Sequence, residues 1–148
     1  MSLVIFGLAV SPSYSLAFEF RPAGLTPCSV WYFLETAKEE LILFFTFDAS
    51  QKFDKLIDFS SEKMSELNEV LAKNPSRAPT VLRRASSFVQ RAKKLAGKVK
   101  KEKDFSLQRE KWLETLAQEL VFLTEKRFQL PQVEPLIKSI KELRHLLL

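Results

Sequence analysis

The sequence predicts an all-α protein, a bundle of about five helices in antiparallel hairpins that follows an irregular N-terminal lead-in. Three glycines among 148 residues supply too few turns for a multi-stranded β-sandwich. Apolar residues recur every three or four positions over segments of helical length. Prolines stand between these segments, and the short connections favour antiparallel neighbours. We expect a single all-α domain over residues 29–148, and the 46% apolar content suits one globular core.

Residues 1–17 carry no charged side chain and resemble a secretory signal peptide in their order. Eight apolar residues, from Leu3 to Val10, precede a helix-breaking Ser-Pro pair and a small-x-small triplet that ends at Ala17. The basic segment that usually opens such a signal is missing. A truncated leader, an uncleaved anchor and a buried segment of the fold therefore stay open as alternatives. The apolar run is shorter than the ~20 residues of a spanning helix. Residues 18–28, which are rich in proline, form the irregular lead-in.

Capping signals divide the remaining chain into helices. Ser29 is the expected N-cap of the first helix, which runs to about Phe45. Asp48 caps the second, and Gln51 three positions later completes a capping box. This helix ends at Asn74, and a short linker over residues 75–79 leads into the third.

The two C-terminal helices are delimited in the same way. Ser106 is the expected cap of the fourth helix, and Pro131 and Pro135 bracket the break before the fifth. Apolar residues at helical spacing give the predicted core positions of the last four helices. They are Phe53, Leu56, Ile57, Met64, Leu67 and Leu71; Val81, Ala85, Phe88, Ala92, Leu95 and Val99; Leu113, Leu116, Leu120 and Leu123; and Leu136, Ile137, Ile140, Leu143 and Leu147.

The third helix has the clearest charge asymmetry in a chain of net charge +5. Six basic residues fall within an arc of about 100° opposite its apolar stripe. We expect this arc to be either a solvated face, partly paired with Glu62, Glu66 and Glu69, or a binding surface for an anionic partner. The arc holds Arg83, Arg84, Arg91, Lys94, Lys98 and Lys101.

The first helix carries more apolar side chains than one buried face can hide. Glu35, Lys38 and Glu39 mark its polar stripe, and Trp31 and Ile42 lie on that same stripe. These two residues need cover, which the lead-in, a partner protein or a second copy of the chain would provide. They join the basic arc as candidate binding residues.

The segment from Gly24 to Lys52, GLTPCSVWYFLETAKEELILFFTFDASQK, resembles an uncharacterised bacterial domain of unknown function that occurs in exported or membrane-anchored proteins. Cys28 and Val30 depart from the family pattern. The resemblance implies an extracytoplasmic helical domain and no known activity. We expect the motif residues to be structural, with caps at either end and aromatic side chains that clamp the helix hairpin between them. The matching positions are Pro27, Ser29, Tyr32, Leu34, Glu39, Phe45, Thr46, Phe47, Asp48 and Lys52.

Catalytic and cofactor motifs are missing from the sequence. One Cys and one His rule out a disulfide framework and a His/Cys metal site. His145 has no nucleophile near it in sequence, and Glu39 and Glu40 point about 100° apart on a helix. We therefore expect neither an enzyme nor a cofactor.

The sequence thus favours an exported, non-catalytic binding or structural module of the bacterial cell envelope. Its expected partner is a protein or an anionic envelope surface, and it has no transmembrane helix in the mature chain; a homodimer is a further option. The alternative is a cytoplasmic protein that binds nucleic acid through its third helix. The arc has no aromatic or amide side chains for base contacts, which disfavours that alternative.

Overall fold

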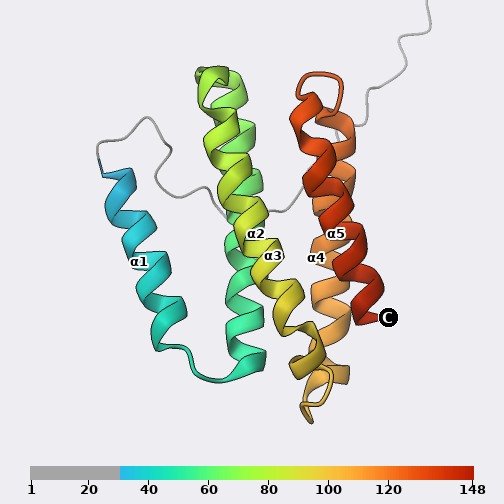
Figure 1. The fold of residues 1–148 in the computed structure, drawn as a ribbon. Helices are drawn as coiled ribbons and strands as arrows, with labels where there is room; N and C mark the ends of the chain where they lie inside the picture. The colour runs from blue at the N-terminus through green and yellow to red at the C-terminus, as the bar shows by residue number, and fades with distance from the viewer. Residues whose placement is uncertain (1–30) are drawn as a thin grey trace, which may run out of the picture.

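The computed structural model describes residues 31–148, which form five α-helices and two short 3-10 helices, with no strand in that range (Figure 1). This confirms the all-α prediction. The predicted leader, the lead-in and the caps at Pro27 and Ser29 lie outside the described residues. The elements are α1 (Tyr32–Phe45), α2 (Ala49–Lys73), η1 (Pro75–Arg77), α3 (Ala78–Val99), α4 (Phe105–Lys126), η2 (Pro131–Val133) and α5 (Glu134–Leu147).

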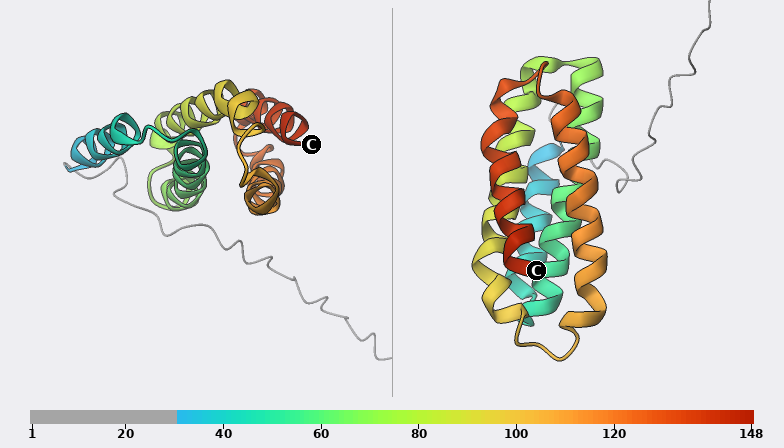
Figure 2. Two further views of the ribbon diagram at one scale, coloured as in Figure 1. Left: turned by 90° about the horizontal axis from the view of Figure 1, so that it is seen from below. Right: turned by 90° about the vertical axis from the view of Figure 1, so that its right-hand side faces the viewer.

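Helices α2 to α5 form the bundle proper. α2 and α3 make one hairpin, α4 and α5 make the second, and the hairpins meet through α2 against α4 and α3 against α5. The end-on view in Figure 2 shows α1 at the edge of this arrangement, beyond α2 and α3 and far from α4 and α5. α1 is therefore an addition to a four-helix core.

Aromatic side chains fill the centre of the bundle. Phe53 of α2 packs on Trp112 of α4, with ring centroids 4.6 Å apart, and Phe59 packs on Phe88 of α3 at 5.5 Å. Trp112 can be buried because its indole N–H donates to Asp54 Oδ1 at 3.0 Å, which satisfies its one polar atom. The predicted stripes of α2, α3 and α5 face this core.

Most helix limits agree with their local signals. The Asp48 carboxylate accepts from the Gln51 amide at 2.7 Å and so confirms the predicted cap of α2. The starts of α1, α3, α4 and α5 differ by one or two residues. α1 begins at Tyr32 with Trp31 in the N-cap position, so the predicted start after Ser29 is wrong. α3 begins at Ala78, inside the predicted linker, because the first turn of a helix tolerates Pro79. α5 likewise begins one residue before Pro135.

Two predictions for α4 are wrong. The helix begins at Phe105 with Asp104 in the N-cap position, and neither Asp104 nor the predicted Ser106 cap forms a capping side-chain bond. Leu113 is only partly buried, and Trp112 takes the deep position in its place. The larger ring fills the space beside Phe53, so the buried stripe shifts by one residue at this end.

Candidate functional site

Helix α1 docks with its carboxylates inward. Glu39 is 3% exposed and Leu43 is fully buried, so these residues mark the face that meets the bundle. The prediction that Glu39 belongs to a solvent-facing polar stripe is therefore wrong. Of the three polar residues of that stripe only Lys38 is exposed. Trp31 is also exposed, whereas Ile42 packs partly buried against the core.

The inward face of α1 is held by a charge cluster, which we define as Glu39, Glu40, Lys63, Glu66, Arg84 and Arg91. Lys63 of α2 is fully buried; its Nζ lies 2.7 Å from Glu39 Oε1 and also binds Glu66. Arg84 of α3 reaches Glu39 Oε2 at 2.7 Å, and Arg91 reaches Glu40 Oε2 at 3.0 Å. Ion pairs thus join α1 to α2 and α3 where apolar packing would usually do so.

Burial perturbs the acids and bases of this cluster. Burial alone would lower the pKa of Lys63, but its hydrogen bonds to Glu39 and Glu66 outweigh that effect and raise it. Burial also raises the pKa of Glu66 to about 7, against the opposing attraction of Lys63. Tyr32 of α1 places its ring 5.6 Å from the Lys63 ammonium, and burial raises the pKa of its hydroxyl. Protonation of Glu66 near neutral pH therefore changes the charge under α1.

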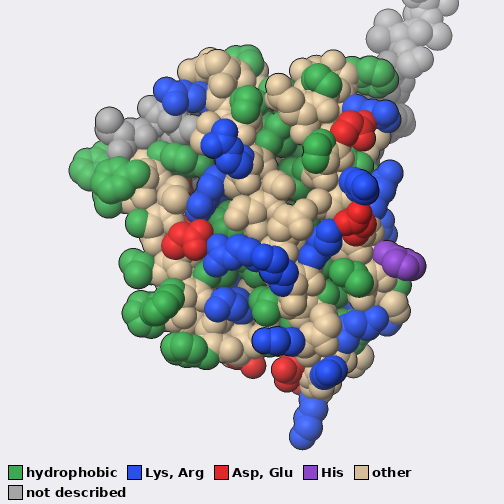
Figure 3. Space-filling view, in the orientation of Figure 1, with side chains coloured by type: hydrophobic (Ala, Val, Ile, Leu, Met, Phe, Trp, Pro, Cys, Tyr) green, Lys and Arg blue, Asp and Glu red, His purple; other side chains and the backbone are tan. Residues whose placement is uncertain are grey.

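The outward side of α1 is apolar, which inverts the usual arrangement of a surface helix. At 100° per residue the exposed residues from Trp31 to Phe45 fall within an arc of about 160°, and Lys38 is the only charge among them. Figure 3 shows hydrophobic side chains gathered along the α1 edge of the molecule. We call this surface the apolar stripe; its members are Trp31, Phe33, Leu34, Leu41, Phe44, Phe45 and Phe47, each 45% to 86% exposed.

The basic arc predicted on α3 divides into two parts. Arg84 and Arg91 belong to the charge cluster, so their acidic partners lie on α1. Two of the three partners expected on α2 pair within that helix, since Glu66 binds Lys63 and Glu69 binds Lys73. The other four residues point to solvent, and we call them the basic face: Arg83, Lys94, Lys98 and Lys101.

A groove brings the apolar stripe and the cations together. It has a volume of about 610 Å³, and Leu41 and Phe44 of the stripe line one side. Lys52 of α2 and Arg91 of α3 supply its positive charge, and Glu40 lies beside Arg91. The groove therefore offers apolar contacts and positive charge to an amphipathic ligand that carries an anionic group.

Only some of the motif residues have the surroundings that the sequence predicted. Asp48 is the helix cap, and Thr46 donates to the Ile42 carbonyl at 2.6 Å as α1 ends. The predicted aromatic clamp is wrong, because Phe45 and Phe47 are 65% and 86% exposed. Lys52 lines the groove, and Leu34 belongs to the apolar stripe.

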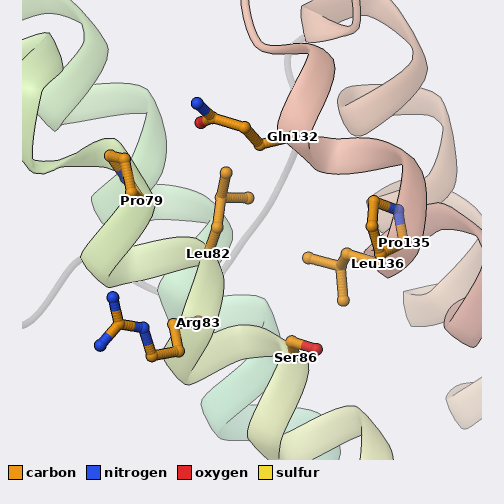
Figure 4. Close-up of a pocket in the computed structure, with 7 residues that line it drawn as sticks. All are labelled: Pro79, Leu82, Arg83, Ser86, Gln132, Pro135 and Leu136. Atoms are coloured by element: carbon orange, nitrogen blue, oxygen red, sulfur yellow. The ribbon is translucent and has the colours of Figure 1, made fainter.

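Two other hollows offer little chemistry. Figure 4 shows a hollow of about 220 Å³ between the start of α3 and α5, in which Leu82 and Leu136 point toward each other and Arg83 points away. A second, of about 510 Å³, contains His145 with Lys93 and the carboxylate of Glu142. No Ser, Thr, Cys or Tyr lines that hollow. The first hollow has no base beside Ser86, and in the second the Lys93 ammonium is paired with Glu142.

One group of carboxylates in residues 31–148 has the spacing of a metal site. Glu35, Glu62 and Glu66 each place an oxygen within 4.8 Å of the others. The ammonium of Lys63 already binds Glu66 and supplies positive charge there. We assign no metal to this group.

The fold and the surface together define a four-helix bundle with an outward-facing apolar helix. The family model of a domain of unknown function, DUF5667, matches residues 24–129, so the chain belongs to that family. This confirms the predicted resemblance to an uncharacterised domain family. The match ends before α5, although α5 packs on both α3 and α4. No curated protein and no solved structure matches the chain. None of the helices in the described part of the chain is long and apolar enough to cross a membrane.

Proposed function

We propose that this protein is a non-catalytic binding module that acts outside the cytoplasm, at the bacterial cell envelope. The observation that supports binding is the apolar stripe. Seven side chains of about 200 Å² each, exposed by 45% to 86%, present on the order of 900 Å² of apolar surface. The largest apolar patch of an ordinary monomer is about 300–600 Å². A surface of this size on one helix indicates a partner.

The uncharged segment over residues 1–17 supports the location. Its test is the intact mass of the full chain after expression in a bacterial host and cell fractionation. We expect a chain that begins at Phe18 and lies outside the cytoplasm. Full-length chain in the cytosol would contradict export, and full-length chain in the membrane fraction would mean an uncleaved anchor.

In-cell photo-cross-linking tests the surface itself. A photoreactive phenylalanine replaces either Phe44, in the apolar stripe, or Phe128, which is 95% exposed beyond the end of α4. We expect adducts with a partner from position 44 and none from position 128. If position 44 gives neither a protein nor a lipid adduct, and Trp31 is not quenched by vesicles, or if both positions give the same adducts, the stripe is not a specific binding surface.

Nucleic-acid binding is the second candidate, and the four solvent-facing cations of α3 favour it. We expect such binding to be mainly to the phosphate backbone, because the basic face has no aromatic or amide side chain among its cations. It predicts an affinity for duplex DNA that falls steeply with salt. Reversal of Lys94 and Lys98 to Glu would remove that affinity, whereas an unchanged affinity would exclude the basic face as its origin.

A further inference from the structure

We propose that the apolar stripe docks on an anionic lipid surface, with α1 lying in the membrane interface. This inference rests on the proposed binding function and names the partner. A helix that binds in this way combines a face of Trp, Phe and Leu with basic residues that meet lipid headgroups. The stripe supplies the first part and the neighbouring cations the second.

The composition of the apolar stripe fits the interfacial zone of a bilayer. Trp31 and four Phe side chains provide most of its exposed area. Aromatic rings are favoured at the boundary between headgroups and acyl chains. The stripe contains no acidic residue, and its one charge, Lys38, can extend its ammonium toward the headgroups.

Cations stand beside the stripe, where anionic headgroups would lie. In the groove, Lys52 and Arg91 adjoin Leu41 and Phe44, so one lipid can place its phosphate on the cations and its acyl chain on the apolar side chains. The basic face of α3 continues this positive surface, as the band of Lys and Arg beside the apolar edge in Figure 3 shows. Each cation near an anionic bilayer contributes about 1 kcal/mol of attraction.

Charge also argues against a second copy of the chain as the partner of the apolar stripe. The stripe has enough area for one side of a standard dimer interface, about 800 Å². A second copy would bring a second +5 charge and a second set of the same cations to that contact. An anionic bilayer meets the apolar and the basic parts at once, and like charges do not oppose it.

The charge cluster explains how the outward orientation is maintained. Glu39 and Glu40 are held by Arg84 and Arg91 at 2.7 and 3.0 Å, so the acidic side of α1 is neutralised within the protein. A lipid surface therefore meets α1 from its apolar side only. Glu39 faces the bundle, whereas Glu40, whose side chain is 45% exposed, borders the groove and is paired there with Arg91.

Fluorescence of Trp31 tests the proposal on the full chain. The chain has two tryptophans; Trp31 is 61% exposed in the stripe, and Trp112 is fully buried in the bundle. Vesicles with brominated acyl chains quench a tryptophan only at close range. We expect Trp31 to be quenched, and Trp112 not, on phosphatidylglycerol vesicles, with at least tenfold weaker binding to phosphatidylcholine vesicles.

Two matched variants identify the surface. Phe33→Ser with Phe44→Ser removes two rings of the stripe, and we expect at least tenfold weaker binding. Leu107→Ser with Phe128→Ser removes two side chains that are 81% and 95% exposed elsewhere, and we expect no change. An equal loss in both variants would overturn the proposal, as would binding that does not depend on lipid charge.

Sedimentation without lipid separates this proposal from the one on which it rests. One outcome is a dimer that dissociates in the variant with Phe33→Ser and Phe44→Ser, while Trp31 stays unquenched on anionic vesicles. This result would assign the stripe to a second copy and would overturn the lipid proposal alone. A protein adduct in the photo-cross-linking experiment, without quenching of Trp31 by vesicles, would assign the stripe to a protein partner and would also overturn the lipid proposal alone. No adduct, no dimer and no quenching would overturn both proposals.

Discussion

Replacement of Lys63 by Met tests whether ion pairs hold α1 on the bundle. The substitution keeps the length of the side chain and removes a fully buried ammonium that binds Glu39 and Glu66. Removal of one partner from a buried ion pair costs about 3–5 kcal/mol. Arg84 still binds Glu39 at 2.7 Å, and Glu66 can take up a proton, so we expect the lower end of that range, about 3 kcal/mol at pH 8.

The loss should depend on pH in a definite direction. The pKa of Glu66 is raised to about 7 in the folded protein, above its ordinary value of 4.5. The folded state therefore binds more protons than the unfolded state between these values, and stability falls as pH rises through that window. Lys63→Met raises the pKa of Glu66 further, because the compensating cation is gone. The free energy lost should thus be smaller at pH 5 than at pH 8.

Urea unfolding followed by far-UV circular dichroism measures both effects. Lys73→Met on the same helix is the control, because Lys73 is 73% exposed in its pair with Glu69 and should contribute less than ~0.5 kcal/mol. A loss below ~1 kcal/mol for Lys63→Met at pH 8, or a loss equal to that of the control, would refute the role of the charge cluster.

Two further predictions concern the bundle itself. Burial raises the pKa of Glu119, which accepts a hydrogen bond from Ser60 at 3.1 Å, to about 8. The free energy of unfolding should therefore fall as pH rises from 4.5, the ordinary pKa, to about 8. Glu119→Gln should remove up to ~3 kcal/mol of that loss at pH 7. Identical profiles of stability against pH for the two proteins would contradict the burial of this acid. Asp48→Ala should lower the free energy of unfolding by about 1 kcal/mol, because the Gln51 amide loses its acceptor, and Asp48→Asn should restore most of it. Equal unfolding midpoints in urea for all three proteins would argue against the cap.

Local signals in the sequence were sufficient to predict the four-helix core. The Asp48 cap, the break around Pro131 and the apolar spacing of α5 each depend on neighbouring residues, and each is found where it was predicted. The errors within the core are shifts of one or two residues. Trp112 replaces Leu113 because the fit of a ring beside Phe53 is decided by a residue about 60 positions away.

The orientation of α1 could not be predicted, because it depends on tertiary charge pairing. Glu39 follows the spacing of a solvated stripe, and nothing near it in sequence supplies a buried cation. Lys63 lies on another helix, seven residues after Leu56 and at the border of the apolar stripe of α2, but lysine side chains are seldom fully buried. The excess of apolar residues in α1 did predict that some of them would stay exposed. The exposed residues differ from those predicted, however, since Ile42 is partly buried and Phe33 and Phe44 are exposed.

Thiol labelling of two adjacent positions tests the orientation of α1 most directly. Leu43 is fully buried and Phe44 is 69% exposed, so cysteines placed there, about 100° apart around the helix, sample its buried and its exposed side. Both variants are made with Cys28→Ser, which removes the single native thiol. We expect the Phe44→Cys variant to react about as fast as an unstructured peptide and the Leu43→Cys variant at least about tenfold more slowly. Faster labelling of Leu43→Cys, with helicity intact in both variants, would mean that the carboxylate side of α1 faces solvent and would contradict the account.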